Sequence, residues 1–190
     1  MTELFLVRHG ATEWSRSGRH TSVTDLPLLP DGEDQARRVR AKLADIGLSP
    51  DDFGLVLSSP RLRARSTAEL AGFSPEIDER LAEWDYGDYE GRTSKEIRGD
   101  VPGWRIWTHP LPGGETRTQI INRLTDVVRR VQASGVERAI CFGHGHSSRV
   151  LALCWLGIDI ARGQSFPLET GAVCVLGHEK ESPAIVRWNA

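Results

Sequence analysis

The chain has 190 residues, of which 39% are hydrophobic and 26% are charged, and its net charge is −2 at pH 7. These values are typical of a globular protein that buries its core without disulfides or a structural metal. We therefore expect one domain over residues 1–190. The balanced mixture of acidic and basic residues argues against a nucleic-acid partner. No apolar run approaches the roughly 20 residues that span a bilayer, so we also expect no membrane partner.

The three cysteines, Cys141, Cys154 and Cys174, are widely spaced and have mostly apolar neighbours. An odd number of cysteines without a CxxC pair predicts reduced core residues rather than disulfides or zinc ligands. The N-terminal segment MTELFLVRHG becomes charged too early for a signal peptide. The sequence therefore predicts a cytoplasmic protein without a metal site, and it carries no signal for an oligomeric state.

Buried strands and amphipathic helices alternate along the chain. The first apolar run, residues 4–7, has the pattern of a strand buried on both faces. In chain order, the pattern then predicts a helix over 31–46, a strand over 53–57, a helix over 61–71, an irregular excursion over about 92–114 with one short helix near 94–98, a helix over 116–133, a strand over 138–142, a helix through 155, and strands over 172–176 and 184–188. This order predicts an α/β fold with three layers, in which a mostly parallel sheet is flanked by helices on both faces.

Three of the predicted strands end in short polar segments: Arg8-His9-Gly10, Ser58-Ser59-Pro60 and Gly143-His144-Gly145. Ligands bind parallel α/β sheets beyond the carboxyl ends of the strands. We therefore expect these three segments to meet at one edge of the sheet and to form a site.

His9 is the first candidate for chemistry, although a lone histidine is more often a hydrogen-bonded structural residue. Its neighbour Arg8 can neutralise an anion, and Gly10 lets the backbone approach one closely. His144 repeats the arrangement of a strand followed by His-Gly. All but three of the 24 cationic residues are arginines, which suit planar anions such as phosphate. Since cations compete with a metal ion, this grouping favours an oxyanion site without a metal.

Five motifs, in order along the chain, resemble the histidine phosphatase superfamily in its phosphoglycerate mutase-like branch. They are LVRHGATEW at 6–14, TDLPL at 24–28 with DG at 31–32, SSPRLRARSTAE at 58–69, LAEWDYGDYEG at 81–91 and CFGHGHSSRVL at 141–151. The resemblance covers almost the whole chain. It implies a phosphoglycerate mutase-like fold.

The resemblance also implies catalytic roles for five residues. His9 would attack phosphorus and become a transient phosphohistidine. Arg8, Arg63 and His144 would surround the transferring phosphoryl group and balance its charge, so that no cofactor is required. Glu83 would protonate the departing alkoxide and later accept a proton from the attacking water.

Four further residues are expected to bind the substrate. Ser15 replaces an asparagine that touches the phosphate in the family's mutases, and its hydroxyl keeps a shorter donor. Thr21 and Ser22 stand where the mutases carry a Ser-Gly pair that contacts substrate, and Ser22 in place of glycine would narrow the pocket. Gly145, next to His144, completes this group.

The segment between the Glu83 motif and the following helix favours hydrolysis over mutase activity. The mutases are longer in this segment and place basic residues there, whereas residues 92–115 here are few and hold only four cations. A less enclosed pocket lets water reach the phosphohistidine. In motif detail the chain is similar to sedoheptulose-1,7-bisphosphatase-like and mycobacterial acid phosphatase-like members. We therefore expect a phosphatase whose partner is a small phosphorylated molecule, a sugar phosphate or bisphosphate.

Other interpretations stay open at this point. A cofactor-dependent phosphoglycerate mutase would use the same residues, and a phosphoprotein phosphatase would apply the same chemistry to a protein segment. A binding module without catalysis is disfavoured, because none of the expected catalytic residues is lost. Trp104 and Trp107 would either form a lid over the site or pack the excursion onto the domain.

Overall fold

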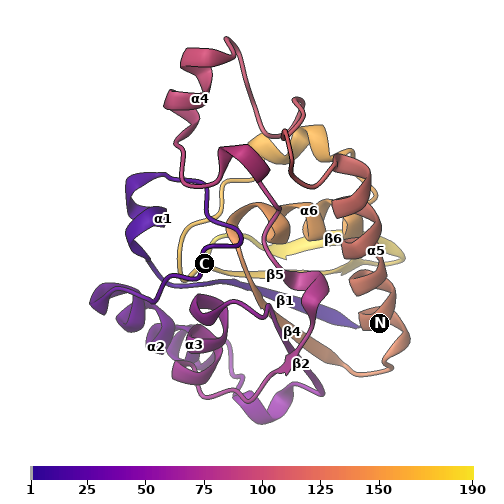
Figure 1. Ribbon diagram of the computed structural model, residues 1–190. Helices are drawn as coiled ribbons and strands as arrows, with labels where there is room; N and C mark the ends of the chain where they lie inside the picture. The colour runs from indigo at the N-terminus through magenta and orange to yellow at the C-terminus, as the bar shows by residue number, and fades with distance from the viewer. Residues whose placement is uncertain (1) are drawn as a thin grey trace.

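The computed structural model describes residues 2–190 and contains a six-stranded sheet with the strand order β3-β2-β4-β1-β5-β6 (Figure 1). The strands are β1 (Glu3–Arg8), β2 (Leu55–Ser58), β3 (Glu76–Ile77), β4 (Arg138–Gly143), β5 (Val173–Glu179) and β6 (Ser182–Arg187). β1 and β2 both run parallel to β4, and β3 runs parallel to β2. β5 is antiparallel to β1, and β6 is antiparallel to β5. The expectation of a mostly parallel sheet is confirmed.

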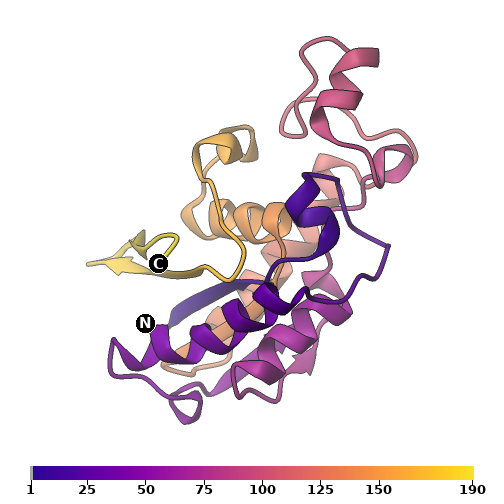
Figure 2. The ribbon, with the colours of Figure 1, turned by 90° about the vertical axis from the view of Figure 1, so that its left-hand side faces the viewer.

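Helices cover both faces of this sheet (Figures 1 and 2). α2 (Pro30–Ala44) and α3 (Leu62–Leu70) lie on one face, and α5 (Arg117–Ala133) and α6 (Gly145–Leu156) lie on the other. Because successive side chains of a strand alternate between faces, Phe5 and Val7 pack with the first helix pair, while Leu4 and Leu6 pack with the second. The predicted three-layer architecture is confirmed. None of the helices within residues 2–190 is long and apolar enough to cross a membrane.

Two short helices and the excursion lie on the side of the molecule where the site is expected. α1 (Glu13–Ser17) and α4 (Ser94–Asp100) stand beyond the sheet, joined by a bridge between Arg19 and Thr93 (Figure 2). The predicted short helix in the excursion is α4, two residues longer than expected. α1 and β3 were not predicted, because α1 has no buried residue that would mark an apolar face and β3 has only two residues. 3-10 turns are present at 50–52, 79–81, 87–89 and 160–165.

The ends of β1, β2 and β4 meet as predicted. In the sheet register Arg8 stands beside Gly143, and Ser58 stands beside Phe142. The parallel pairing continues one residue beyond β1, since the His9 N–H donates to the Gly143 carbonyl at 3.0 Å. The three polar segments therefore lie at one edge of the sheet.

A close glycine contact holds the segment after β1 against α2. A Cβ on Gly10 would lie 2.1 Å from the Gly32 carbonyl oxygen, and a Cβ on Gly32 would lie 2.1 Å from the Ala11 carbonyl oxygen. The Ala11 carbonyl also accepts from the Leu29 N–H at 2.8 Å, just before α2 begins. Only residues without a side chain permit this approach, which places the His9 segment on the first turn of α2.

We expect Gly32→Ala to lower the free energy of unfolding by about 2–3 kcal/mol, because its methyl group would force two backbone segments apart. Gly99→Ala is the matched control, since it also lies in a helix but its Cβ would meet nothing within 4 Å. That control should be neutral or more stable by up to about 1 kcal/mol. Urea denaturation of both variants measures the difference, and equal stabilities would contradict the close contact.

Candidate active site

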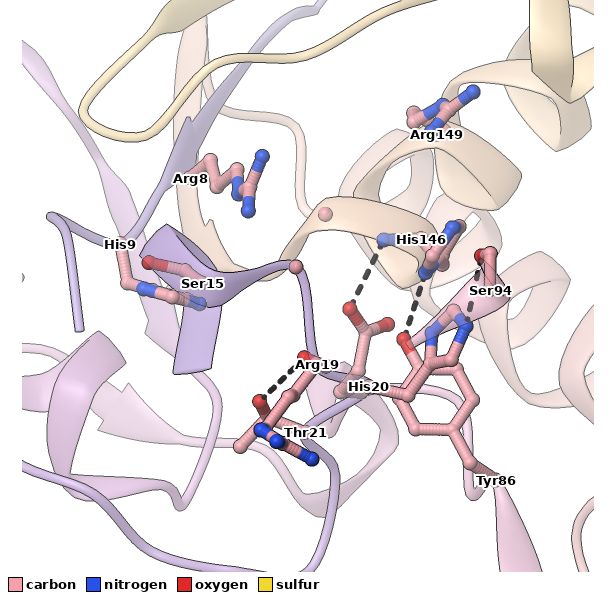
Figure 3. A pocket seen from close by; sticks show the side chains of 13 residues that line it. Arg8, His9, Ser15, Arg19, His20, Thr21, Tyr86, Ser94, His146 and Arg149 are labelled. Atoms are coloured by element: carbon pink, nitrogen blue, oxygen red, sulfur yellow. Dashed lines mark hydrogen bonds between the residues drawn. The ribbon is translucent and has the colours of Figure 1, made fainter. Parts of the chain in front are cut away.

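A cavity of about 230 Å³ opens at this edge of the sheet (Figure 3). Six of the residues expected at the site line it. The complete lining is Arg8, His9, Ser15, Gly18, Arg19, His20, Thr21, Glu83, Tyr86, Ser94, Gly145, His146 and Arg149. The other three expected residues, Ser22, Arg63 and His144, are buried and do not line the cavity. The His144 ring nevertheless lies 5.3 Å from the His9 ring, centre to centre.

His9 is held in one tautomer by its own backbone. The ring is 5% exposed, and its Nδ1 lies 2.7 Å from the Gly10 carbonyl oxygen. A carbonyl only accepts, so Nδ1 carries the hydrogen and Nε2 presents a lone pair. Burial, reinforced by the positive charges of Arg63 and Arg8, holds the pKa of His9 well below its ordinary value. His9 is therefore neutral, with one ring nitrogen free to act as a nucleophile.

Arg63 on α3 is fully buried, and peptide carbonyls hold it. Its Nη1 donates to the Thr24 carbonyl at 3.0 Å, and its Nη2 donates to the Thr21 and Ser22 carbonyls at 3.0 and 3.2 Å. Its Nε makes no hydrogen bond within residues 2–190. The nearest carboxylate, Asp25, is 3.9 Å away. Because carbonyls hold the guanidinium without neutralising it, its charge remains available for an anion.

Arg8 is arranged in the same way at the end of β1. Its Nη1 donates to the Leu168 carbonyl, and its Nε has no partner within the protein. A Cβ on Gly145 would lie 3.3 Å from the Arg8 guanidinium carbon. The glycine therefore lets this guanidinium lie against the first turn of α6, at the cavity wall (Figure 3).

His144 occupies the N-cap position of α6, without a capping hydrogen bond from its side chain, and is fully buried. Its Nε2 lies 2.7 Å from the Ser59 hydroxyl oxygen, which also accepts from the Arg61 N–H at 3.3 Å. The serine can thus donate its own hydrogen to Nε2, which leaves the ring hydrogen on Nδ1. Burial, followed by the charge of Arg63, holds the pKa of His144 well below its ordinary value. Nδ1 has no partner within the protein.

The buried nitrogens without partners thus include Arg8 Nε, Arg63 Nε and His144 Nδ1, all close to His9 in sequence or space. Buried N–H groups are normally paired, and an anion would pair these three. The arrangement fits an oxyanion.

Glu83 is fixed by backbone donors. Its Oε1 accepts from the Trp84 and Ser147 N–H groups at 2.8 and 2.7 Å, and its Oε2 accepts from the His146 N–H at 3.0 Å. The last two donors belong to the first turn of α6, where N–H groups have no helical partner and favour negative charge. Glu83 is 6% exposed and lines the cavity. Its carboxyl group is therefore held in one place beside the reacting region.

The wall beyond Glu83 consists of uncharged hydrogen-bonding groups. The Tyr86 hydroxyl lies 2.7 Å from His146 Nδ1, and His20 Nε2 lies 3.2 Å from the Ser94 hydroxyl (Figure 3). Burial lowers the pKa of His20 to about 4 and holds the pKa of His146 well below its ordinary value. His20 and His146 are cavity-lining residues that the predicted site did not include. Tyr86 and His146 lie inside the fourth and fifth motifs, which was the available signal for this wall, whereas His20 and Ser94 lie outside all five motifs.

The expected substrate-binding hydroxyls differ in where they point. Ser15 and Thr21 line the cavity, but the Ser15 hydroxyl closes a capping box with Thr12 and the Thr21 hydroxyl donates to the Arg19 carbonyl at 3.1 Å. The Ser22 hydroxyl donates to the Glu83 carbonyl at 3.3 Å. The expectation that Ser22 narrows the pocket is therefore corrected, since its hydroxyl is directed to the backbone.

The excursion is packed onto the rest of the protein by its tryptophans. Trp104 and Trp107 are 1% and 4% exposed, which supports packing rather than an open lid. Arg149 stacks over Trp107, with its guanidinium carbon 4.5 Å from the ring centroid, and donates to the Gly163 carbonyl. It also lines the cavity, and burial lowers its pKa to about 10.

The fold and the site define an α/β protein with paired neutral histidines and buried arginines at the carboxyl edge of its sheet. The chain belongs to the histidine phosphatase superfamily, whose branch 1 model matches residues 4–190. It is 39% identical over 178 residues to an acid phosphatase of Mycobacterium tuberculosis, covering 93% of this chain and 86% of the relative. It is 37% identical to sedoheptulose 1,7-bisphosphatase of Saccharomyces cerevisiae, and the match covers 83% of this chain and 68% of that relative. The solved structure of an open reading frame product of Mycobacterium tuberculosis matches it with a TM-score of 0.94 at 35% identity. The match covers 99% of this chain and 97% of the chain in that structure. The family resemblance of the motifs is confirmed.

The buried histidines predict how stability depends on pH. His9, His20, His144 and His146 have folded-state pKa values below 6.5, so below that pH the unfolded chain binds more protons than the folded one. Stability is then complete above about pH 6.5 and decreases as pH falls, by about 1.4 kcal/mol per pH unit for each such histidine.

Urea denaturation between pH 7.5 and 5.5 measures this slope. We expect His20→Gln to reduce the dependence of the free energy of unfolding on pH by the contribution of one histidine, about 1.4 kcal/mol per pH unit. A free energy of unfolding that does not change across this range would contradict the neutral, buried state of these rings.

Proposed function

We propose that this protein is a phosphatase that hydrolyses small phosphomonoesters, sugar phosphates or bisphosphates, through a phosphohistidine on His9. The observation that carries the proposal is a neutral histidine with a free Nε2, whose ring lies 5.3 Å from the His144 ring and within the influence of the Arg63 and Arg8 charges, while Arg8 Nε, Arg63 Nε and His144 Nδ1 have no partner within residues 2–190. Membership of the superfamily and the names of the two relatives, both phosphatases, support it. Residues 1–190 act as one domain in this proposal.

In the first step the phosphoryl group binds to Arg8, Arg63 and His144 Nδ1–H. His9 Nε2 attacks phosphorus, and the bond between phosphorus and the ester oxygen breaks. Glu83 gives its proton to the departing alkoxide and is left as the carboxylate. The guanidinium groups stabilise the charge on the phosphoryl oxygens, which is the main requirement of this transfer.

In the second step a water molecule attacks the phosphohistidine. Glu83 takes a proton from that water. The water oxygen bonds to phosphorus, and the bond between phosphorus and His9 Nε2 breaks. Inorganic phosphate leaves, and His9 returns to its neutral form. Throughout both steps the Gly10 carbonyl accepts from Nδ1–H, which stabilises the positive ring while the phosphoryl group is attached.

The rest of the cavity supports a polyhydroxylated leaving group. His20, Tyr86, Ser94 and His146 present neutral donors and acceptors that suit sugar hydroxyls. Arg149 adds a positive charge that suits a second anionic group of the substrate.

We also propose a cytoplasmic location. Cys141 and Cys174 are buried free thiols, and Cys154 is a half-buried one. Thiols that stay unpaired are typical of a reducing compartment.

A substrate panel tests the proposed activity. Sugar phosphates, sugar bisphosphates, phosphoglycerates and phosphopeptides are compared by kcat/KM, with and without EDTA. We expect sugar phosphates or bisphosphates to be the best substrates and EDTA to have no effect. His9→Ala should lose at least about 1000-fold in kcat, because the nucleophile is absent, while His109→Ala, outside the cavity, should not.

Two outcomes would replace the proposed function. Isomerisation of 3-phosphoglycerate faster than its hydrolysis would make the protein a mutase. Phosphopeptides hydrolysed in preference to every sugar phosphate would make it a phosphoprotein phosphatase.

A further inference from the structure

The loop over residues 21–25 is held between two charged side chains, Arg63 and Glu90. Arg63 belongs to the proposed phosphoryl site, whereas Glu90, in the YGDYEG part of the fourth motif, has no role in the mechanism above. We propose that Glu90 is a positioning residue that sets the Arg63 guanidinium for phosphoryl transfer by fixing this loop. The inference rests on the proposed function.

Glu90 binds the amide side of the loop. Both of its carboxylate oxygens lie 2.9 Å from the Ser22 nitrogen, and its Oε1 also accepts from the Thr24 N–H at 3.0 Å. Hydrogen bonds to an ionised carboxylate are about twice as strong as those between neutral groups. One side chain thus fixes two alternate amides of the loop.

Arg63 binds the carbonyl side of the same residues. The peptide group between Thr21 and Ser22 donates its N–H to Glu90 and accepts from Arg63 through its carbonyl. Thr24 donates its N–H to Glu90 and accepts from Arg63 through its carbonyl, and these two groups belong to successive peptide bonds. The loop therefore lies between a carboxylate and a guanidinium, and the peptide group between Thr21 and Ser22 is polarised by both.

The segment that carries Glu90 is itself held against the loop by hydrogen bonds. The His20 N–H donates to the Arg92 carbonyl at 2.9 Å, and the Gly91 N–H donates to the His20 carbonyl at 2.8 Å. Gly91 has φ +75°, and a Cβ there would lie 3.0 Å from the Trp14 ring. Glycine alone fits this conformation and this contact, so Glu90 is presented to the loop from a defined position.

Arg63 depends on the loop for its orientation. All three of its hydrogen bonds within the protein end on loop carbonyls, and the side chain is completely buried. A loop that shifts would take these acceptors with it and turn the guanidinium away from the phosphoryl group. Without Glu90 the Ser22 and Thr24 amides lose their acceptors, and the loop keeps only its other contacts, such as the Ser22 hydroxyl on the Glu83 carbonyl and the Leu62 N–H on the Asp25 carboxylate, so its middle can shift.

The effect of Glu90 is one of position rather than charge. Burial lowers the pKa of Arg63 below its ordinary value, and the carboxylates whose charges oppose this are Glu83 and Asp25. Glu90 reaches Arg63 only through the peptide groups of the loop. Its removal is therefore expected to lower kcat and weaken binding of a phosphoryl transition-state mimic, because both require the guanidinium in place.

The first test uses Glu90→Ala and Glu90→Gln, with Asp88→Asn as the matched control. Asp88 is exposed, lies two residues away on the same turn and carries the same charge. With p-nitrophenyl phosphate as substrate, Glu90→Ala should lower kcat by about 10–100-fold, because small displacements at a reacting centre cost this much. Inhibition by vanadate should weaken in parallel. Glu90→Gln should lose less, since its amide oxygen still accepts, and Asp88→Asn should match the wild type.

The decisive test is a double-mutant cycle with Arg63→Ala. If Glu90 acts through Arg63, Glu90→Ala should lower kcat by less than about 3-fold once Arg63 is absent. A purely structural role would produce the same loss in both backgrounds and would contradict the proposal. If Glu90→Ala does not fold, Glu90→Gln and Glu90→Asp take its place in the cycle.

The outcomes separate this inference from the proposed function. A wild-type protein that hydrolyses no phosphomonoester would contradict the proposed function itself. A wild-type enzyme that is active, with Glu90 variants that match it in kcat and vanadate inhibition, would contradict only the role of Glu90.

Discussion

The hydrogen bond from His9 Nδ1 to the carbonyl of its own neighbour, Gly10, determines what this site can do. It keeps the hydrogen on one nitrogen and leaves the other as a lone pair, and burial beside guanidinium groups keeps the ring neutral. The bond depends in turn on the backbone after β1, which β4 holds on one side and the first turn of α2 on the other. The packing of a strand and a helix thus selects the reactive tautomer.

The buried charged side chains of the site are fixed by uncharged peptide groups rather than by ions of opposite charge. Arg8 and Arg63 are held by peptide carbonyls, and Glu83 is held by peptide N–H groups. No carboxylate lies closer than 3.9 Å to Arg63. Buried cations that are fixed by neutral dipoles keep their charge for a ligand, and this suits a reaction whose main need is to stabilise phosphoryl oxygens.

The sequence predicts the three layers because continuous apolar runs mark the buried strands and apolar residues at helical spacing mark the helices between them. Leu4 to Val7 alternates between two cores, and α5 buries Ile120, Leu124, Val127 and Val131 at helical spacing. The meeting of His9 and His144 follows from the rule that parallel strands end at a common edge. These predictions need only local periodicity and strand direction.

The remaining features depend on contacts between distant segments, which a pattern does not encode. β3 has two residues and takes its place only by pairing with β2. Ser22 is turned to the Glu83 backbone, and His20 is drawn into the cavity wall by pairing with residues 91 and 92. The role of Glu90 appears only when the loop between it and Arg63 is seen in space. In each case tertiary packing decided where the residues lie and where their side chains point, and of β3, Ser22, His20 and Glu90 only Glu90 belongs to one of the five motifs.

The central claim is that the phosphoryl group is carried on Nε2 of His9. Mixing the protein for milliseconds with a ³²P-labelled phosphomonoester, quenching in base and mapping the labelled peptide tests it most directly. The account predicts label on the peptide that contains His9, as the Nε2 isomer, and no label in His9→Ala. Label on Nδ1, on another residue, or undiminished in His9→Ala would contradict it.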